Sequence, residues 1–316
     1  MSATAPKESH PIRWAKKAKH LTALGMLRSA RQTHSRRAYY LLVLPAALIL
    51  LLVNTFPLLY SCCISLTNYS FSDPDTVSFA GLNNFVQAFR DPMFLNSLLM
   101  TVKFTSGCVV LEFLLGLLIA VLLNRLDRYA NLVLGVFLLP MMITPIIVGL
   151  LWRFMLNDQS GLVNYFLAVI GIGRFPFLSN ANSALLSIML ADLWQWTPFV
   201  ILLLYSGLQA LPKDPYEAAA LDGASGFQKF CHITFPAMRN TMLICVLIRG
   251  MDAFREYDKV YTMTYGGPGS ATESASFYIY RQGFVFFNTG FSTALSLIML
   301  ALTIMIVQTS VVKLRL

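Results

Sequence analysis

Charged and polar side chains interrupt two apolar runs of this chain, where they could bind a polar solute. They are Asp192, Trp194, Gln195 and Trp196 in one run, and Arg249, Asp252, Arg255 and Glu256 in the other. Charged and amide groups hydrogen-bond hydroxyls, and aromatic rings stack on apolar ring faces. Inside a membrane such groups usually face a cavity or one another. The pattern therefore predicts either a path for a hydroxyl-rich solute or an ion-pair network between helices.

The second run predicts a charged stripe if its helix is continuous. At 100° per residue, Arg249, Asp252, Glu256 and Lys259 fall within about 80° of one another. The six charges from 249 to 259 sum to zero, which fits pairing along one face. Other charges fall close to the ends of apolar runs, where long side chains can reach the membrane surface: Lys103, Arg153, Asp258 and Lys259.

The elements that must carry these groups are membrane-spanning helices. The chain has 316 residues, of which 56% are hydrophobic and only 12% charged, and its mean hydropathy is +0.62. About 20 helical residues cross a hydrocarbon core. Six apolar runs are long enough: 39–64, 98–123, 132–156, 184–208, 238–262 and 291–312. We therefore expect an all-α membrane protein with six transmembrane helices.

The distribution of basic residues predicts the orientation. The net charge is +9, and basic residues gather in a tail at 1–37, in the loop at 209–237 and at the C-terminal end. The alternate loops contain only Arg90, Arg174 and Arg281. By the positive-inside rule, both termini and the 209–237 loop are cytoplasmic. The charge thus sets orientation and does not indicate nucleic acid binding. The tail either folds on the lipid surface or remains a flexible orienting segment ahead of a transmembrane domain at 38–316.

The sequence does not favour catalysis or metal binding. The four histidines, His10, His20, His34 and His232, lie outside the predicted spans, so none can act as a base to a serine inside the membrane. The five cysteines have no metal-ligand spacing. No G-x-x-x-x-G-K-[ST] sequence occurs, so this chain lacks the loop that holds ATP phosphates. We expect no catalytic residue, metal or cofactor on this chain.

The cytoplasmic loop contains a short helix signal. Asp214, Pro215 and Glu217 have the order of an N-cap, a first helical residue and a capping-box partner, which predicts a helix beginning at 215. Ala218, Ala219 and Leu221 make a shallow apolar face, whereas Glu217 and Asp222 are polar. Such a helix suits a groove on another protein. Gly223 either turns the chain at the helix end or admits a partner's backbone.

The spacing in this loop resembles a known signature. Glu217-Ala218-Ala219, three residues, Gly223, nine residues, Ile233, one residue and Phe235-Pro236 is similar to the EAA loop, EAA-x3-G-x9-I-x-L-P, of binding-protein-dependent ABC importer permeases. Only Phe235 departs from it. The resemblance implies a type I importer permease fold, with a coupling helix at 215–224 that docks in a cleft of a separate ATPase subunit.

Further segments are similar to the carbohydrate-uptake group of the maltose and glycerol-phosphate transporter type. They are 79–85 (FAGLNNF) and 265–269 (YGGPG). The resemblance implies a second permease chain, two ATP-binding cassette subunits carrying ATP and Mg²⁺, an extracytoplasmic solute-binding protein and a bacterial cytoplasmic membrane. The alternative is an ion-coupled secondary transporter of a polar solute. Such carriers often contain two related halves, and this sequence has no such repeat.

Overall fold

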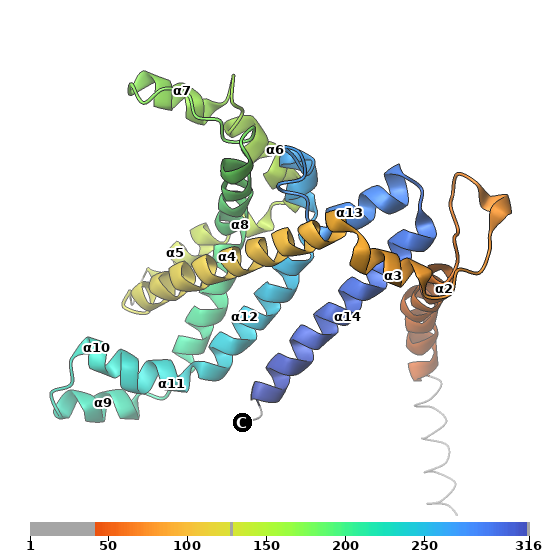
Figure 1. Ribbon diagram of the computed structural model, residues 1–316. Helices are drawn as coiled ribbons and strands as arrows, with labels where there is room; N and C mark the ends of the chain where they lie inside the picture. Colours follow the sequence, from red (N-terminus) through yellow and green to blue (C-terminus); the bar gives the residue numbers. More distant parts are fainter. Residues whose placement is uncertain (1–41, 127–128, 315–316) are drawn as a thin grey trace, which may run out of the picture. The chain divides into compact units, whose positions relative to one another are not determined.

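The chain is built from helices, with a long loop between α2 (Phe56–Ser65) and α3 (Asn83–Arg90) (Figure 1). The computed structural model describes residues 42–126 and 129–314. Over these residues, β-pairing is limited to isolated bridges, as between Thr67 and Phe79. The chain divides into one unit that ends at Ser61 and a second unit, Cys62–Leu316. The basic tail at 1–37 lies outside the described residues. The all-α prediction is confirmed.

The first helix is long enough to cross a membrane. It runs over Leu42–Ser65, contains a π-helical turn at Leu51–Thr55, and continues as α2 (Phe56–Ser65). Its side chains from Leu42 to Tyr60 are exposed, as expected of a helix whose surroundings are lipid.

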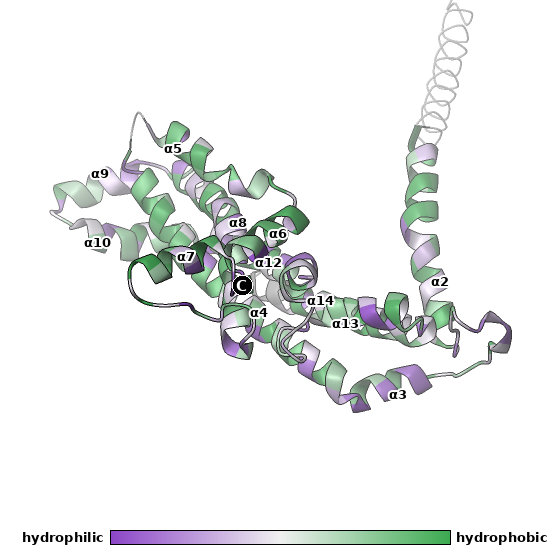
Figure 2. Cartoon of the chain, turned by 90° about the horizontal axis from the view of Figure 1, so that it is seen from above, coloured by the Kyte–Doolittle hydropathy of each residue, from purple (hydrophilic) through white to green (hydrophobic). Residues whose placement is uncertain are grey.

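The second unit contains the remaining helices. They are α3 (Asn83–Arg90), α4 (Pro92–Leu123), α5 (Ala130–Phe137), α6 (Pro145–Met155), α7 (Leu162–Val169), α8 (Ala181–Gln209), α9 (Asp214–Leu221), α10 (Gly226–Lys229), α11 (Phe235–Ala237), α12 (Arg239–Phe254), α13 (Ala275–Tyr280) and α14 (Thr289–Leu314). The longer helices are mainly hydrophobic, whereas α3 is largely hydrophilic (Figure 2).

Helix α4 begins where the sequence has an N-cap signal. The Asp91 carboxylate accepts hydrogen bonds from the backbone N–H groups of Met93 at 2.9 Å and Phe94 at 3.4 Å. Pro92 occupies the first helical position, where its missing N–H costs nothing. The helix therefore starts six residues before the apolar run at 98–123.

Helices α4 and α8 pack closely against each other. A Cβ added at Gly116 of α4 would lie 2.5 Å from Val200 Cγ1 of α8 and 3.4 Å from the Ile201 backbone nitrogen. Ala120, one turn further on, is fully buried. Small residues let two helices approach closely in a membrane, where lipid gives no hydrophobic drive for association. At the C-terminal ends of α4 and α8, Gln209 donates to Asn124 at 2.9 Å.

The expectation of six continuous helices is wrong in two places. Over residues 42–126 and 129–314, four helices are long and apolar enough to span a membrane, or five with one bent pair. The run at 132–156 breaks into α5, a 3-10 turn at Pro140–Met142, and α6. Thr144 is extended because Pro145 disfavours helical geometry in the residue before it.

The fifth run breaks at both ends. Gly226–Ala237 and Arg239–Phe254 form the bent pair, with an angle of 66° between them. Helix α12 stops at Phe254, and a π-helical segment begins at Val260. The charges at 249 to 259 therefore do not form a stripe on one continuous helix, so that prediction is wrong.

Filling the α4–α8 contact should destabilise the fold. We expect Gly116→Ala to cost roughly 1–3 kcal/mol, because its methyl group meets Val200 and the backbone behind it. The matched control is Gly135→Ala on α5, where an added Cβ meets nothing within 4 Å. The thermal midpoint of the detergent-solubilised protein measures both. Equal midpoints for the two variants would contradict the close contact.

Candidate functional site

Five charged groups meet in the interior of the helical unit. Arg249 of α12 binds Glu112 of α4, with Nε to Oε2 at 2.6 Å and Nη2 to Oε1 at 3.0 Å. Arg249 also pairs with Asp192 of α8. Lys259 Nζ lies 2.9 Å from Asp192 Oδ1 and 3.2 Å from Glu256 Oε2. We call these five residues the buried ion network; it ties three long helices together.

The network is withdrawn from solvent. Glu112, Asp192 and Lys259 are fully buried and Arg249 is 2% exposed. Moving an ion out of water is expensive, so each of these groups needs its partners and leaving one alone is strongly destabilising. Lys259, which the sequence placed near the membrane surface, instead points into this interior.

The end of α12 makes this arrangement possible. After Phe254 the chain leaves the helix, and the Glu256 carboxylate accepts the Lys259 backbone N–H at 2.8 Å. Ser274 Oγ holds the same turn by donating to the Glu256 carbonyl at 2.7 Å. Because of this break, Lys259 points back towards Asp192. In a continuous helix, Lys259 would lie further along the helix axis.

A charged cavity of about 300 Å³ lies beside the network. Its lining includes Trp196, Arg249, Asp252, Arg255 and Glu256. Arg255 and Asp252 pair with each other at 3.3 Å, and their side chains are 67% and 45% exposed. The Arg249 guanidinium lies 5.4 Å from the centre of the Trp196 ring. The cavity therefore offers hydrogen-bonding charges beside an aromatic face.

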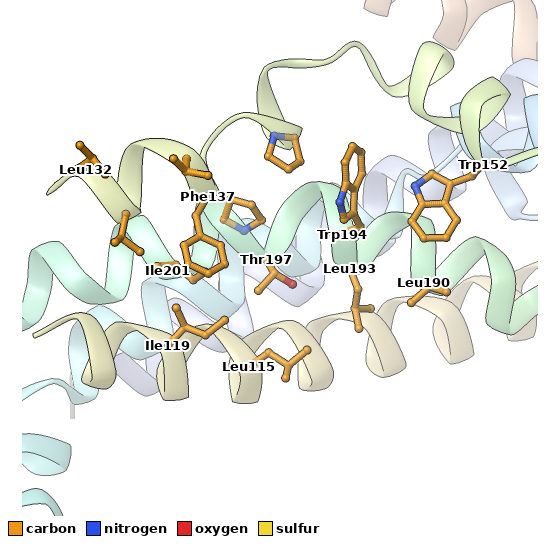
Figure 3. A pocket seen from close by; sticks show the side chains of 14 residues that line it. Leu115, Ile119, Leu132, Phe137, Trp152, Leu190, Leu193, Trp194, Thr197 and Ile201 are labelled. Atoms are coloured by element: carbon orange, nitrogen blue, oxygen red, sulfur yellow. The ribbon is translucent and has the colours of Figure 1, made fainter. Parts of the chain in front are cut away.

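The three neighbouring residues of α8 do not gather at this cavity. Trp194 lines an apolar groove of about 570 Å³ and packs edge-on against Trp152 of α6 (Figure 3). Gln195 is buried and its Nε2 donates to the Ile143 carbonyl at 2.8 Å, which satisfies a backbone group at the break before α6. Trp196 alone of the three faces the charges. Successive helical residues diverge by about 100°, which explains the separation.

The cytoplasmic loop signal produces an exposed helix. Helix α9 begins at Asp214, and Lys213 precedes it without a side-chain cap, so the predicted Asp214 cap and start at 215 are wrong. All five of Glu217, Ala218, Leu221, Asp222 and Gly223 are exposed, and Ala219 is half-buried. Leu221 is 91% exposed. Helices α9 and α10 lie side by side beyond the ends of α8 and α12 (Figures 1 and 2).

Gly223 ends α9 with a defined turn. Its φ is +77°, and hydrogen bonds run from Gly223 N to Ala220 O at 3.1 Å and from Ala224 N to Ala219 O at 2.9 Å. This is the Schellman pattern, which favours glycine because the left-handed conformation is costly for other residues. An added Cβ would meet nothing within 4 Å. The glycine is therefore required for the turn, and the surface beside it is open.

Two further polar contacts lie near the start of α4 and α13. Arg281 Nη1 binds the buried Glu273 carboxylate at 2.7 Å, and Tyr278 donates its hydroxyl to Asp91. Burial raises the pKa of Glu273 above its ordinary value, and Arg281 opposes this shift. Within the described part of the chain, no cluster of three or more His, Cys, Asp or Glu residues could hold a metal ion.

Sequence reasoning singled out Asp192, Arg249, Glu256 and Lys259 but not their partners. Glu112 and Asp192 stand out as carboxylates within apolar runs, which is the signal that could have paired them with Arg249. The contact from Gln195 to Ile143 carries no such signal, because it satisfies a backbone group exposed only by the break in the third run.

This chain belongs to the family of binding-protein-dependent transport system inner membrane components, whose sequence model matches residues 112–313. A probable ABC transporter permease of Sinorhizobium fredii is 38% identical over 80% of this chain and 82% of the relative. The trehalose/maltose transport system permease MalF of Thermococcus litoralis is 35% identical over 84% and 89%. The sn-glycerol-3-phosphate permease UgpA of Agrobacterium fabrum is 34% identical over 72% and 78%. The resemblance drawn from the EAA loop is confirmed.

A solved structure shares the fold. A bacterial ABC transporter involved in alginate import superposes with a TM-score of 0.79 at 21% identity, covering 91% of this chain and 98% of that chain. This likeness establishes the importer permease fold for the chain, and it agrees with the helical architecture described above.

Replacing Arg249, which pairs with both Glu112 and Asp192, should destabilise the buried ion network. We expect Arg249→Gln to cost about 3–5 kcal/mol, because it leaves Glu112 and Asp192 buried without their shared partner. The matched control is Arg255→Gln, which breaks an exposed pair that contributes about 0–1 kcal/mol. Thermal midpoints in detergent compare the two. A smaller loss for Arg249→Gln than for Arg255→Gln would contradict a structural role for the network.

Proposed function

We propose that this chain is the membrane-spanning permease subunit of an ATP-driven importer for a sugar or sugar-like solute. The observation that carries the proposal is the family match together with the solutes in the relatives' names, trehalose, maltose and sn-glycerol 3-phosphate. The charged cavity supports it, since hydroxyl groups can bond its carboxylates and guanidinium groups, and sugar rings can stack on Trp196.

The energy for import comes from other chains. The sequence has no P-loop, so two ATP-binding cassette subunits supply ATP and Mg²⁺, and this chain is not itself the enzyme. A second, related permease chain completes the membrane domain, and an extracytoplasmic protein delivers the solute. An alginate transporter solved with its periplasmic protein supports the last point by its shared fold.

Helix α9 couples the permease to an ATPase subunit. Glu217, Ala218, Ala219, Leu221, Asp222 and Gly223 make the contact. Support comes from Leu221, an apolar side chain that is 91% exposed in a helix too short to be stable by its own packing. Tyr216 anchors the helix to the permease through a 2.9 Å hydrogen bond with Thr234, so a push on α9 is passed into the segment that leads to α12.

The polar residues of the solute path have two different roles. Trp196, Asp252, Arg255 and Glu256 contact the solute in the charged cavity. Asp192, Gln195 and Arg249 hold the walls of that cavity, as their burial supports. Trp194 shapes the path from the apolar side of α8.

The chain lies in a bacterial cytoplasmic membrane with both termini and α9 in the cytoplasm. The basic residues of the tail and of the 209–237 loop support this orientation through the positive-inside rule. The tail at 1–37 forms a separate cytoplasmic segment, and the transmembrane domain occupies 38–316.

Replacing Leu221 should weaken the coupling between this chain and the ATPase subunit. We expect Leu221→Ser to leave the thermal midpoint of the chain unchanged and to lower solute-stimulated ATP hydrolysis of the complex about tenfold or more, because a buried leucine contributes about 1.5–3 kcal/mol. The matched control is Leu82→Ser, an exposed leucine just before α3. Wild-type stimulation in Leu221→Ser would refute the docking role.

Loss of a cavity carboxylate should impair uptake. We expect Asp252→Ala to reduce uptake at low solute concentration about tenfold or more, since a hydrogen bond to a charged group contributes about 1.5–3 kcal/mol. Assembly and basal ATP hydrolysis should persist. Asp75→Ala, an exposed carboxylate far along the chain from the cavity, serves as the control. Uptake and solute preference equal to wild type would remove Asp252 from the path.

A further inference from the structure

A second polar cavity, of about 350 Å³, lies at the start of α4 and α14. Three separate segments build it: the loop after α2, helix α3, and the residues that lead into α14. Backbone hydrogen bonds tie the first and third segments together, from Gly290 N to Tyr69 O at 2.8 Å and from Phe71 N to Phe287 O at 3.0 Å. Its volume falls within the usual range for small-molecule pockets, roughly 300–1,000 Å³.

Neutral amide groups dominate the lining of this cavity. The lining includes five carboxamides, Asn68, Asn84, Gln87, Gln282 and Asn288. Asp91, Tyr69 and Phe291 complete it. Carboxamides both donate and accept hydrogen bonds, as the hydroxyl groups of a carbohydrate do, and two aromatic rings provide faces for a sugar ring.

A hydrogen-bond chain fixes one wall. Asp91 accepts the Tyr278 hydroxyl, Gln282 Nε2 donates to the Tyr278 oxygen at 2.7 Å, and Asn288 Nδ2 donates to Gln282 Oε1 at 3.3 Å. On the other wall, Asn84 is 6% exposed, and both of its hydrogen bonds use Nδ2, to the carbonyls of Ser65 and Thr67 at 2.8 Å. The walls are therefore preorganised, which lowers the cost of binding.

Several hydrogen-bonding groups in the cavity remain available. Among the described residues, no hydrogen bond uses the side-chain Oδ1 of Asn84, the side-chain Oδ1 of Asn288 or the side-chain amide of Gln87. The lining contains no cation and one carboxylate, so it does not suit a phosphate. That carboxylate is already occupied by two backbone N–H groups and the Tyr278 hydroxyl, which leaves no set of ligands for a metal.

The cavity lies at the opposite end of α4 from the coupling helix. Helix α4 has 32 residues and is therefore about 48 Å long. Asp91 precedes its start, whereas its C-terminal end meets the end of α8, just before α9, through the bond from Gln209 to Asn124. If α9 is cytoplasmic, this cavity opens on the outer side of the membrane.

We propose that this cavity binds a neutral carbohydrate on the outer side, as a site separate from the charged cavity. The placement rests on the proposed function, in which solute enters from the side opposite to α9. Carbohydrate units that carry no phosphate should be preferred, because Asp91 repels an anion and no lining cation offsets this.

Cysteine protection in the full transporter complex tests the site. The reporter is Gln87→Cys in a background with serine at Cys62, Cys63 and Cys231, labelled by a membrane-impermeant maleimide. With a dissociation constant of about 1 mM, trehalose at about 5 mM should slow labelling about sixfold. sn-Glycerol 3-phosphate should not slow it. Phe89→Cys, on the same helix but outside the cavity, should label at one rate throughout.

Two further variants test whether the protection by trehalose depends on the outer cavity or on the charged cavity. Asn288→Ala, an exposed position, should abolish protection by trehalose, whereas Asp252→Ala in the charged cavity should preserve it. Absence of protection by both trehalose and maltose would overturn the inference, as would equal protection at Phe89→Cys. Protection that needs the external binding protein and no sugar would overturn it in favour of a protein contact.

Uptake by the same complex separates the two proposals. Sugar uptake without protection at Gln87→Cys would reject the outer site and leave the proposed function standing. Protection without ATP-driven sugar uptake would reject the proposed function and leave the outer site standing.

Discussion

The pairing of buried charges is the constraint on which the rest of this structure depends. Arg249 cannot lie unpaired in a membrane interior, and its bonds to Glu112 and Asp192 fix α12 against α4 and α8. Asp192 also needs Lys259, so the chain must leave the helix after Phe254 and turn back. That turn creates the edge of the charged cavity. A requirement of charge pairing therefore determines where a helix ends and where the charged cavity forms.

Burial divides the polar groups into a frame and a lining. The frame contains Arg249, Asp192 and Gln195, which are buried and bond to other parts of the helical unit. The lining contains Asp252 and Arg255, which pair with each other and remain exposed. Helix α9 follows the same logic at the surface, because its apolar Leu221 is almost uncovered by the described residues. In the charged cavity and on α9, the exposed groups indicate the chemistry of the molecule that would bind there.

Much of this could be predicted from the sequence. Apolar length predicted the helices, the EAA spacing predicted the exposed loop helix and the family, and several charges within apolar runs proved to be members of the buried ion network. The breaks were missed, because hydropathy does not distinguish a continuous helix from two pieces that meet at Ile143 and Thr144. The stripe at 249 to 259 failed for the same reason, since a 100° rotation holds only where the helix continues. Trp194, Gln195 and Trp196 are adjacent in the sequence, which suggested a single group of solute contacts. Their side chains instead point to three different surroundings. Asp214 lost its predicted capping role because Lys213 takes that position.

We propose that import through this chain is driven by ATP on partner subunits. Uptake of labelled trehalose or maltose into proteoliposomes that contain the complete transporter and its external binding protein tests it most directly. The account predicts uptake that requires ATP on the ATPase side and continues when a protonophore collapses the proton gradient. Uptake that persists without ATP and disappears with the gradient would contradict it and identify an ion-coupled carrier.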